Sequence, residues 1–304
     1  MKSTFNDIPV SQLVRQRYSC RTYRDQPLTA EHRNALNEYV QELPVGPFGG
    51  TPRFQLVAAR ESDSSALKKL GTYGFIRGAQ GYLVGAMQDY AYNHEDYGYL
   101  MELIILFATG KGLGTCWLGG TFTKSSFGKA IAVQDDELVP AVTALGYPAK
   151  KPRWVESLIR GGAGADNRLP WGNLFTAAHS QELLPESIDA YAKVLEMVRW
   201  APSASNKQPW RIVKEADRWH FFLQRTPGYG ERRLNKKFTV ADMQRLDMGI
   251  AMCHFELAAR ELDLAGRWVV EDPGLTELDP VNTYIVSWVD DNRGKRSTSA
   301  GAVD

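Results

Sequence analysis

The apolar positions of the chain predict two long helices, one in each half. In residues 96–110, apolar side chains recur at the spacing of a helix, and further apolar residues lie between them, so this helix is expected to be buried all round. The positions at helical spacing are Leu100, Leu103, Ile104, Phe107 and Ala108. A comparable helix in residues 247–261 also carries Glu256, Arg260 and Glu261. We therefore expect the second helix to be more amphipathic than the first.

The two helix patterns belong to a longer repeat. Residues 96–118 align without a gap with residues 247–269, at an offset of 151 positions. In both copies a turn and an apolar segment with a tryptophan follow the helix. The identical pairs are Asp96/Asp247, Gly98/Gly249, Met101/Met252, Leu106/Leu257, Ala108/Ala259, Leu113/Leu264 and Trp117/Trp268. At the same offset Arg17 meets Arg168. We therefore predict two diverged copies of one α/β unit, packed about a pseudo-two-fold axis.

The length and the composition restrict the organisation further. The 304 residues suffice for two domains, which we place at residues 1–160 and 161–289, and the polar residues 290–304 are predicted to be a disordered tail. With 36 basic and 35 acidic residues, the chain gives no reason to expect nucleic acid or acidic membranes as partners.

Processing signals and metal motifs are also missing from the sequence. No apolar stretch approaches the roughly 20 residues that span a bilayer, and residues 1–9 lack the apolar core of a signal peptide. The three cysteines are far apart and form neither a zinc pattern nor a disulfide framework. We therefore expect a cytoplasmic protein without a metal site.

A polar loop in residues 201–210 is bracketed by Pro202 and Pro209. It contains Ser203, Ser205 and Asn206, and it lies between a helix pattern and a short β-like segment. A polar loop held between two rigid elements suits a small-molecule site. Taken alone, however, the composition fits an ordinary helix end and turn better.

Two cationic clusters lie in the first half. Arg17, Ser19 and Arg21 alternate, so an extended backbone would place them on one face, where they could bind a phosphate or an electron-rich ring edge. Alone, this short motif is better explained as a solvated basic patch. Lys151 and Arg153 follow a Gly-Tyr-Pro turn, and an anion site and a charged linker explain them equally well.

The glycine-rich residues 110–120 do not form a nucleotide fingerprint, because they follow a helix and precede a strand. A helix C-cap explains the first glycines, whereas Gly119 and Gly120 would let a flat ligand approach the backbone. The second copy has Val270 and Glu271 at the latter positions, and the first copy lacks the serines and the asparagine of the polar loop. Each half therefore keeps different parts, which predicts one composite site between the halves and one that has decayed.

Together these motifs resemble the FMN-dependent nitroreductase family. The matching segments are Arg-x-Ser-x-Arg at residues 17–21, Gly-Leu-Gly-x-x-Trp-x-Gly-Gly at 112–120, Gly-Tyr-Pro with Lys-x-Arg at 146–153, and Pro-Ser-x-x-Asn-x-Gln-Pro-Trp at 202–210. Ordinary members are homodimers with two FMN sites at the subunit interface, so a chain with both sets of motifs resembles the fused, pseudo-dimeric branch. The resemblance implies an α+β fold of three-layer α/β/α units, present twice in a monomer that acts as a pseudo-dimer.

The resemblance also implies the cofactor site. FMN would be held by Arg17, Ser19, Arg21, Leu118, Gly119, Gly120, Lys151, Arg153, Ser203, Ser205 and Asn206, with Arg77 as a weaker candidate. No side chain is assigned as a catalytic acid.

The implied reaction is of the ping-pong type. NAD(P)H reduces the flavin at N5, and an electron-poor small molecule then takes up the electrons. Two alternatives stay open: an FMN enzyme with another acceptor (an enone, a quinone or a halogenated aromatic), and a flavin-binding protein without turnover. The sequence does not distinguish NADH from NADPH, nor does it identify the physiological substrate.

Overall fold

The structure is a computed structural model that describes residue 5, residues 8–58, residue 67, and residues 70–150, 167–228, 241–275 and 281–291. The helices are α1 (Val10–Gln16), α2 (Ala30–Gln41), α3 (Asn93–Gly110), α4 (Lys124–Ala130), α6 (Trp171–Leu174), α7 (Tyr191–Arg199) and α8 (Met243–Glu261). The strands are β1 (Arg53–Ala58), β2 (Gly81–Gln88), β3 (Gly114–Leu118), β4 (Glu137–Leu138), β5 (Val142–Gly146), β6 (Phe175–Ala177), β7 (Gln181–Glu182), β8 (Trp210–Glu215), β9 (Arg218–Gln224), β10 (Gly266–Val269) and β11 (Asn282–Asp290). Short 3-10 helices comprise Ala178–Ser180, Pro185–Ser187 and Ala204–Asn206.

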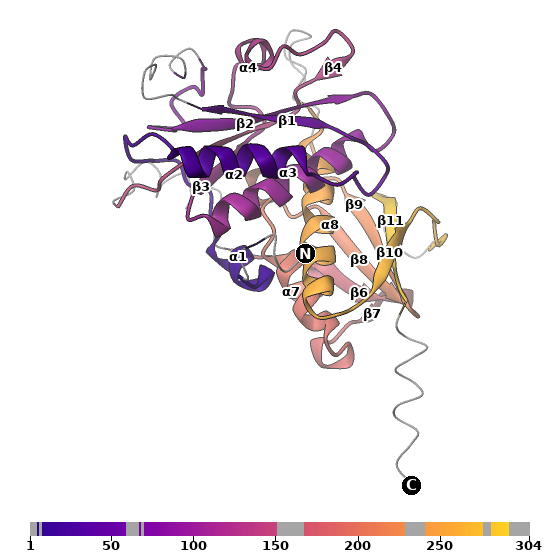
Figure 1. The fold of residues 1–304 in the computed structure, drawn as a ribbon. Coiled ribbons are helices and arrows are strands. Elements are labelled where there is room, and N and C mark those ends of the chain that lie inside the picture. Colours follow the sequence, from indigo (N-terminus) through magenta and orange to yellow (C-terminus); the bar gives the residue numbers. More distant parts are fainter. Residues whose placement is uncertain are drawn as a thin grey trace.

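Each half of the chain contributes one β-sheet (Figure 1). In the first sheet the strands lie in the order β1, β2, β5, β3, and β4 pairs with β2. In the second sheet the order is β8, β9, β11, β10, with β6 and β7 beyond β8. In each half, four strands thus share one arrangement: the first strand along the chain lies at one end, followed by the second, the fourth and the third. The pairs are antiparallel except for β6 and β8, which run parallel.

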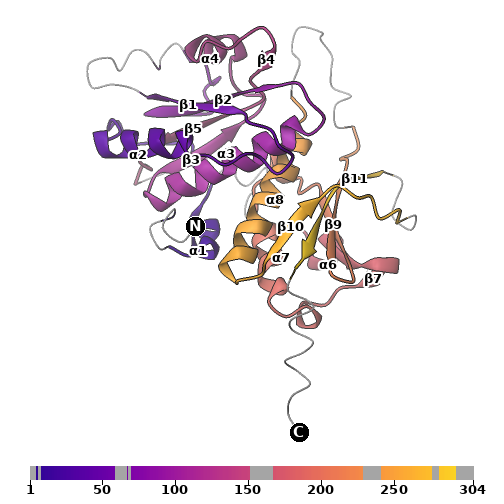
Figure 2. The ribbon, with the colours of Figure 1, turned by 45° about the vertical axis from the view of Figure 1, so that its right-hand side comes forward.

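Helices α3 and α8 lie between the two sheets (Figures 1 and 2). Helix α3 contacts β2 and β3, while α8 contacts β8, β9 and α7. On the first sheet, α2 and α3 lie along one face and α4 lies on the other. The result is an α+β fold with its main helices at the centre. Among the helices of the described residues, none has the length and apolar character that crossing a membrane requires.

The two central helices approach each other through a pair of glycines. A Cβ atom on Gly98 would overlap the carbonyl oxygen of Leu246, and one on Gly249 would overlap the carbonyl oxygen of Glu95. The overlapped atoms are backbone atoms, which a side-chain rotation cannot move. Glycine at these two positions therefore permits the close packing of α3 on α8.

Both central helices are buried over most of their length. This was predicted for α3, but α8 differs from the amphipathic helix that its charges suggested. Glu256 is only 5% exposed. Its burial is compensated by hydrogen bonds from Tyr99 Oη at 2.8 Å and Trp268 Nε1 at 2.6 Å and by the ion pair with Arg260. The sequence pattern missed this burial because a charged side chain can be buried when its partners come from elsewhere in the chain.

The alignment of Arg17 with Arg168 is wrong, because the two segments do not occupy equivalent places in the structure. Residues 17–23 lie beside the first sheet, through bridges from Ser19 to Thr115 on β3 and from Thr22 to Arg77. The segment that begins at Arg168 leads instead into β6, which pairs with β8, away from β10. Arg17 and Arg168 therefore meet in the alignment but occupy different places relative to their sheets.

The chain-end and boundary predictions are only partly covered by the structure. Asp290, with which the expected tail began, is the last residue of β11 and pairs with Gly266. The rest of the predicted tail from residue 292, and the expected join at residues 161–166, lie outside the described residues. The domain limits stay predictions.

Candidate functional site

The segment after α1 has the extended backbone that its alternating residues require. Arg17 ends α1 with ψ near 128°, and Ser19 bridges to Thr115 on β3. Cys20 is buried, whereas Tyr18 is 39% exposed. Arg21 donates a hydrogen bond from Nη1 to the Ser19 carbonyl oxygen at 3.3 Å. The segment is thus a short extended edge along β3, with Ser19 and Arg21 both partly exposed.

The Arg17 side chain reaches into the core between the two halves. Only 6% of it is exposed, and its Nε lies 3.9 Å from Oε1 of Glu102 on α3. The Glu102 carboxylate also accepts a hydrogen bond from Trp117 Nε1 at 2.9 Å, and Nε2 of His254 on α8 lies 3.0 Å from Oε1. The other ring nitrogen of His254 lies 3.0 Å from the Met197 carbonyl oxygen. A buried carboxylate needs such partners, so this cluster ties the cationic segment to both halves.

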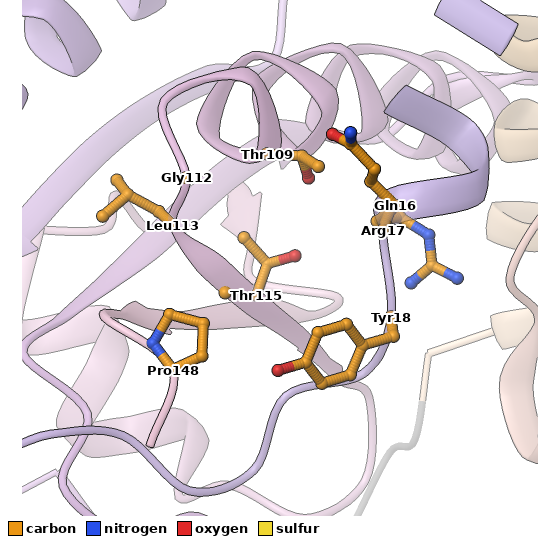
Figure 3. Close-up of a pocket in the computed structure, with 9 residues that line it drawn as sticks. Gln16, Arg17, Tyr18, Thr109, Gly112, Leu113, Thr115 and Pro148 are labelled. Atoms are coloured by element: carbon orange, nitrogen blue, oxygen red, sulfur yellow. The ribbon is translucent and has the colours of Figure 1, made fainter. Parts of the chain in front are cut away.

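A small cavity of about 160 Å³ lies on the other side of the segment. Its lining includes Tyr18, Thr115 and Pro148. Figure 3 shows the Tyr18 ring facing Thr115 and Pro148, while the guanidinium of Arg17 points away from them. Arg17 therefore borders this cavity but directs its charge elsewhere.

The glycine-rich residues form the predicted helix C-cap, but Gly119 and Gly120 differ in their surroundings. Gly112 has a positive φ of 72°, and the Leu113 N–H donates to the Ala108 carbonyl oxygen at 3.0 Å, which confirms a helix C-cap. Leu118 is buried at the end of β3. A Cβ on Gly119 would overlap the side chain of Met243, the first residue of α8, whereas a Cβ on Gly120 would meet nothing within 4 Å. Gly119 therefore lies against the second half, and Gly120 faces open space.

The polar loop of the second half has a strained backbone that hydrogen bonds hold in place. Ser205, Asn206 and Gln208 have φ values of 51°, 54° and 48°, a region that residues other than glycine rarely adopt. The Gln208 N–H donates to Ser203 Oγ at 2.8 Å, and the Asn206 side chain donates to the Asn167 carbonyl oxygen at 2.8 Å. Clusters of strained residues that the surroundings enforce are frequent at ligand sites.

A buried carboxylate on α8 holds this loop. Asp247 is 1% exposed, and its two oxygens lie 3.0 and 3.1 Å from the backbone nitrogen of Ala204, which donates to them. Burial raises the pKa of Asp247 well above its usual value, and the Ala204 N–H acts in the opposite direction. Asp96 plays the same part in the first half, because it accepts hydrogen bonds from the N–H groups of Phe48 at 2.9 Å and Gly50 at 2.8 Å.

The structure brings several predicted site residues to the same region. Gly119 touches Met243 at the start of α8, and the loop with Ser203, Ser205 and Asn206 is fastened to the same helix through Asp247. Near the base of that loop, the Arg15 guanidinium, two residues before Arg17, lies 5.7 Å from the centre of the Trp200 ring. Segments far apart in the chain thus meet around α8.

Other predicted residues are placed differently or are not placed. The Arg77 N–H donates to the Arg21 carbonyl oxygen at 2.9 Å, so Arg77 lies beside the cationic segment, and its side chain is exposed. Lys151 and Arg153 lie outside the described residues.

Three residues of this region were missed by the motif analysis: Glu102, His254 and Asp247. The only available signal concerned Asp247, which is identical to Asp96 at the repeat offset. Glu102 and His254 align with Cys253 and Leu103, so the repeat gave no indication of their pairing.

Comparison with known protein families assigns the chain. The family model described as "Putative TM nitroreductase" matches residues 9–259. The chain belongs to this nitroreductase family. A comparison with curated proteins gives no match.

One solved structure supports the fold of this nitroreductase, and two others are partial matches. A putative nitroreductase from Thermotoga maritima aligns with 93% of this chain and 94% of its own, with a TM-score of 0.57 and 18% identity. A putative nitroreductase in complex with FMN from Desulfovibrio desulfuricans aligns with 50% of this chain and 95% of its own, with 24% identity and a TM-score of 0.37. A Bacteroides fragilis nitroreductase with bound FMN aligns with 47% of this chain and 90% of its own, with 21% identity and a TM-score of 0.37.

Proposed function

We propose that this nitroreductase is an FMN-dependent oxidoreductase with one composite cofactor site per chain. The observation that carries the proposal is the meeting of two segments at the start of α8. Gly119 of the first half lies against Met243, and Asp247, one helical turn later, holds the loop of residues 203–206. The family match supports an oxidoreductase, and FMN is bound in the named Desulfovibrio and Bacteroides proteins.

The residues around this place fit a flavin phosphate and ring in their chemistry. Arg21 and Ser19 offer a cation and a hydroxyl at a partly exposed edge, and Gly120 leaves space in which a flat ring can approach the backbone. Ser203, Ser205 and Asn206 would cover the ligand from the second half. Arg17 fits less directly, because its guanidinium faces Glu102. It would contribute a positive charge near the ligand without a direct contact. Lys151 and Arg153 are assigned to the phosphate by the resemblance alone.

We infer that the composite site arises from two diverged copies of one unit packed as an intramolecular pseudo-dimer. Three observations support this: the common strand order of the two sheets, the reciprocal contacts of Gly98 and Gly249, and the equal roles of Asp96 and Asp247. The members of each residue pair are 151 positions apart. On this account the chain functions as a monomer.

We propose that the corresponding place in the pseudo-dimer, where other side chains stand, holds no second cofactor. Glu271, which aligns with Gly120, forms an ion pair with Arg218 at 2.6 Å. Phe48 of the first-half loop stacks on Tyr92, with ring centres 4.2 Å apart. Tyr92 aligns with Met243 at the repeat offset. An aromatic pair thus fills the place that corresponds to the proposed site, which is why we propose one site rather than two.

Bound FMN would supply the hydride chemistry, while the chain supplies binding and electrostatics. The cationic Arg21 favours a ligand that carries or gains negative charge. We propose NAD(P)H as the reductant and an electron-poor small molecule as the acceptor, which use the same open face one after the other in a ping-pong order.

The test uses one variant from each half. Arg21→Ala and Asn206→Ala are each expected to weaken FMN binding about tenfold or more, because a hydrogen bond to a charged ligand contributes about 1.5–3 kcal/mol. Arg267→Ala and Asn173→Ala serve as matched controls, because Arg267 is an exposed arginine on β10 that pairs with Asp291, and Asn173 is an exposed asparagine on α6. FMN affinity is measured by quenching of flavin fluorescence. Unchanged affinity in either site variant would contradict a shared site, and a wild-type protein that takes up no FMN would contradict the flavin function.

A further inference from the structure

One face of α8 carries the contacts that separate the two walls of the proposed site. Met243 and Asp247 are four residues apart, so they lie on the same face of the helix, one turn from each other. Met243 lies against Gly119, which belongs to the first-half wall. Asp247 accepts both of its hydrogen bonds from Ala204, which belongs to the second-half wall. The rise of one helical turn therefore sets the spacing of the two walls.

The loop that Asp247 holds does not adopt an easy conformation. Ser205, Asn206 and Gln208 are left-handed. Hydrogen bonds join Gln208 to Asn206 and to residue 169: the Leu169 N–H donates to Gln208 Oε1 at 2.9 Å, and Gln208 Nε2 donates to the Asn206 carbonyl oxygen at 3.1 Å. These bonds give the loop its shape, but they connect it only to its own half. The hydrogen bond to Asp247 connects it to the central helix, and thus to the wall of the other half.

We propose that Asp247 is a positioning residue of the ligand site, which fixes the loop of residues 203–208 at the distance from Gly119 that the ligand requires. The identity of the ligand rests on the proposed function, whereas the hold of Asp247 on the loop does not depend on it. Asp247 does not touch the ligand in this scheme, because it is buried beneath the loop.

The chain contains its own matched control. Asp96 is equally buried and also accepts backbone hydrogen bonds from a loop, but that loop belongs to the place where Phe48 and Tyr92 stack. Removal of either carboxylate takes a buried group from a central helix and frees backbone donors, so both changes destabilise the fold. Only the removal of Asp247 is expected to affect the ligand.

The experiment compares Asp247→Ala with Asp96→Ala in the full chain. Asp247→Ala is expected to weaken FMN binding about tenfold or more, and to speed hydrogen exchange of the amides of residues 204–208 at least tenfold in the FMN-free protein. Asp247→Asn, which keeps one acceptor oxygen, is expected to restore most of both. Asp96→Ala is expected to leave FMN affinity within about twofold.

A second variant removes the same bond without a change in the core. Ala204→Pro deletes the donor N–H, and the extended Ser203 before it (φ −145°, ψ 159°) tolerates a following proline. It is expected to reproduce the loss of affinity of Asp247→Ala.

The outcomes separate the two proposals. Unchanged affinity in both Asp247→Ala and Ala204→Pro, or equal losses in Asp247→Ala and Asp96→Ala, would overturn the positioning role. If wild-type protein takes up no FMN, the proposed function fails, but hydrogen exchange still tests whether Asp247 holds the loop. Faster exchange at residues 204–208 in Asp247→Ala supports this hold, and unchanged exchange refutes it.

Discussion

The contact of α3 with α8 through Gly98 and Gly249 allows a quantitative prediction. Replacement of Gly98 by alanine would place a Cβ against the carbonyl oxygen of Leu246, well inside the 3.0 Å that such atoms essentially never approach. Because the obstacle is backbone, the helices must separate locally. Alanine also favours the helix, so two effects of opposite sign compete.

The magnitudes decide the sign. Alanine in place of glycine within a helix gains about 1 kcal/mol. Overpacking against a rigid neighbour costs typically 1–3 kcal/mol and sometimes more, and we take about 4 kcal/mol here because backbone meets backbone. Gly98→Ala is therefore expected to lower the free energy of unfolding by about 3 kcal/mol, which corresponds to a fall in Tm of roughly 6 °C.

The control is a helical glycine with free space around it. Gly172 lies in α6, and a Cβ there would meet nothing within 4 Å. Gly172→Ala is expected to be neutral or stabilising by up to about 1 kcal/mol. Thermal and urea unfolding followed by circular dichroism measure both variants. A Gly98→Ala protein as stable as Gly172→Ala would refute the close-packing argument.

Two further predictions concern titratable groups that are wholly or partly buried. Glu102→Gln removes the carboxylate that Arg17 and His254 face, and should lower the free energy of unfolding by about 3 kcal/mol in urea titration. Glu38 is exposed, so Glu38→Gln should change this free energy by less than about 0.5 kcal/mol. Equal effects of the two changes would contradict the buried cluster. Burial, with Arg245 nearby, lowers the pKa of His94 from 6.5 to about 4, so the unfolded chain binds more protons than the folded protein between these values. The stability should therefore fall by about 3 kcal/mol as the pH drops from about 6.5 to 4, and His94→Gln should flatten this pH profile; an unaltered profile would contradict it.

The sequence was informative where structure is determined locally. The helices α3 and α8, the strand β3 after its glycine cap, and the helix–loop–strand around residues 201–210 follow from periodicity and from proline and glycine placement. The repeat predicted two copies of one α/β unit, and the common strand order of the two sheets is compatible with that prediction. It failed at Arg168, where the aligned segment is short and its strand pairs at another edge of the sheet.

The parts of the site that depend on distant contacts could not be predicted. The partner of Arg17 is a glutamate 85 positions away, and the partner of Asp247 is a backbone N–H, which has no signature in the sequence. The left-handed backbone at Ser205 and Asn206 is likewise enforced by surrounding hydrogen bonds rather than by glycine. Motifs predict which segments form the site, whereas burial and long-range pairing decide how these segments are held.

The stoichiometry of FMN tests the central claim most directly. The wild-type chain is incubated with excess FMN and separated from free flavin, and the bound flavin is quantified by its visible absorbance against the protein concentration. The mass of the complex is measured by light scattering. A single composite site in a pseudo-dimeric monomer predicts one FMN per chain and the mass of one chain, about 34 kDa. Two FMN per chain, or none, would contradict the account.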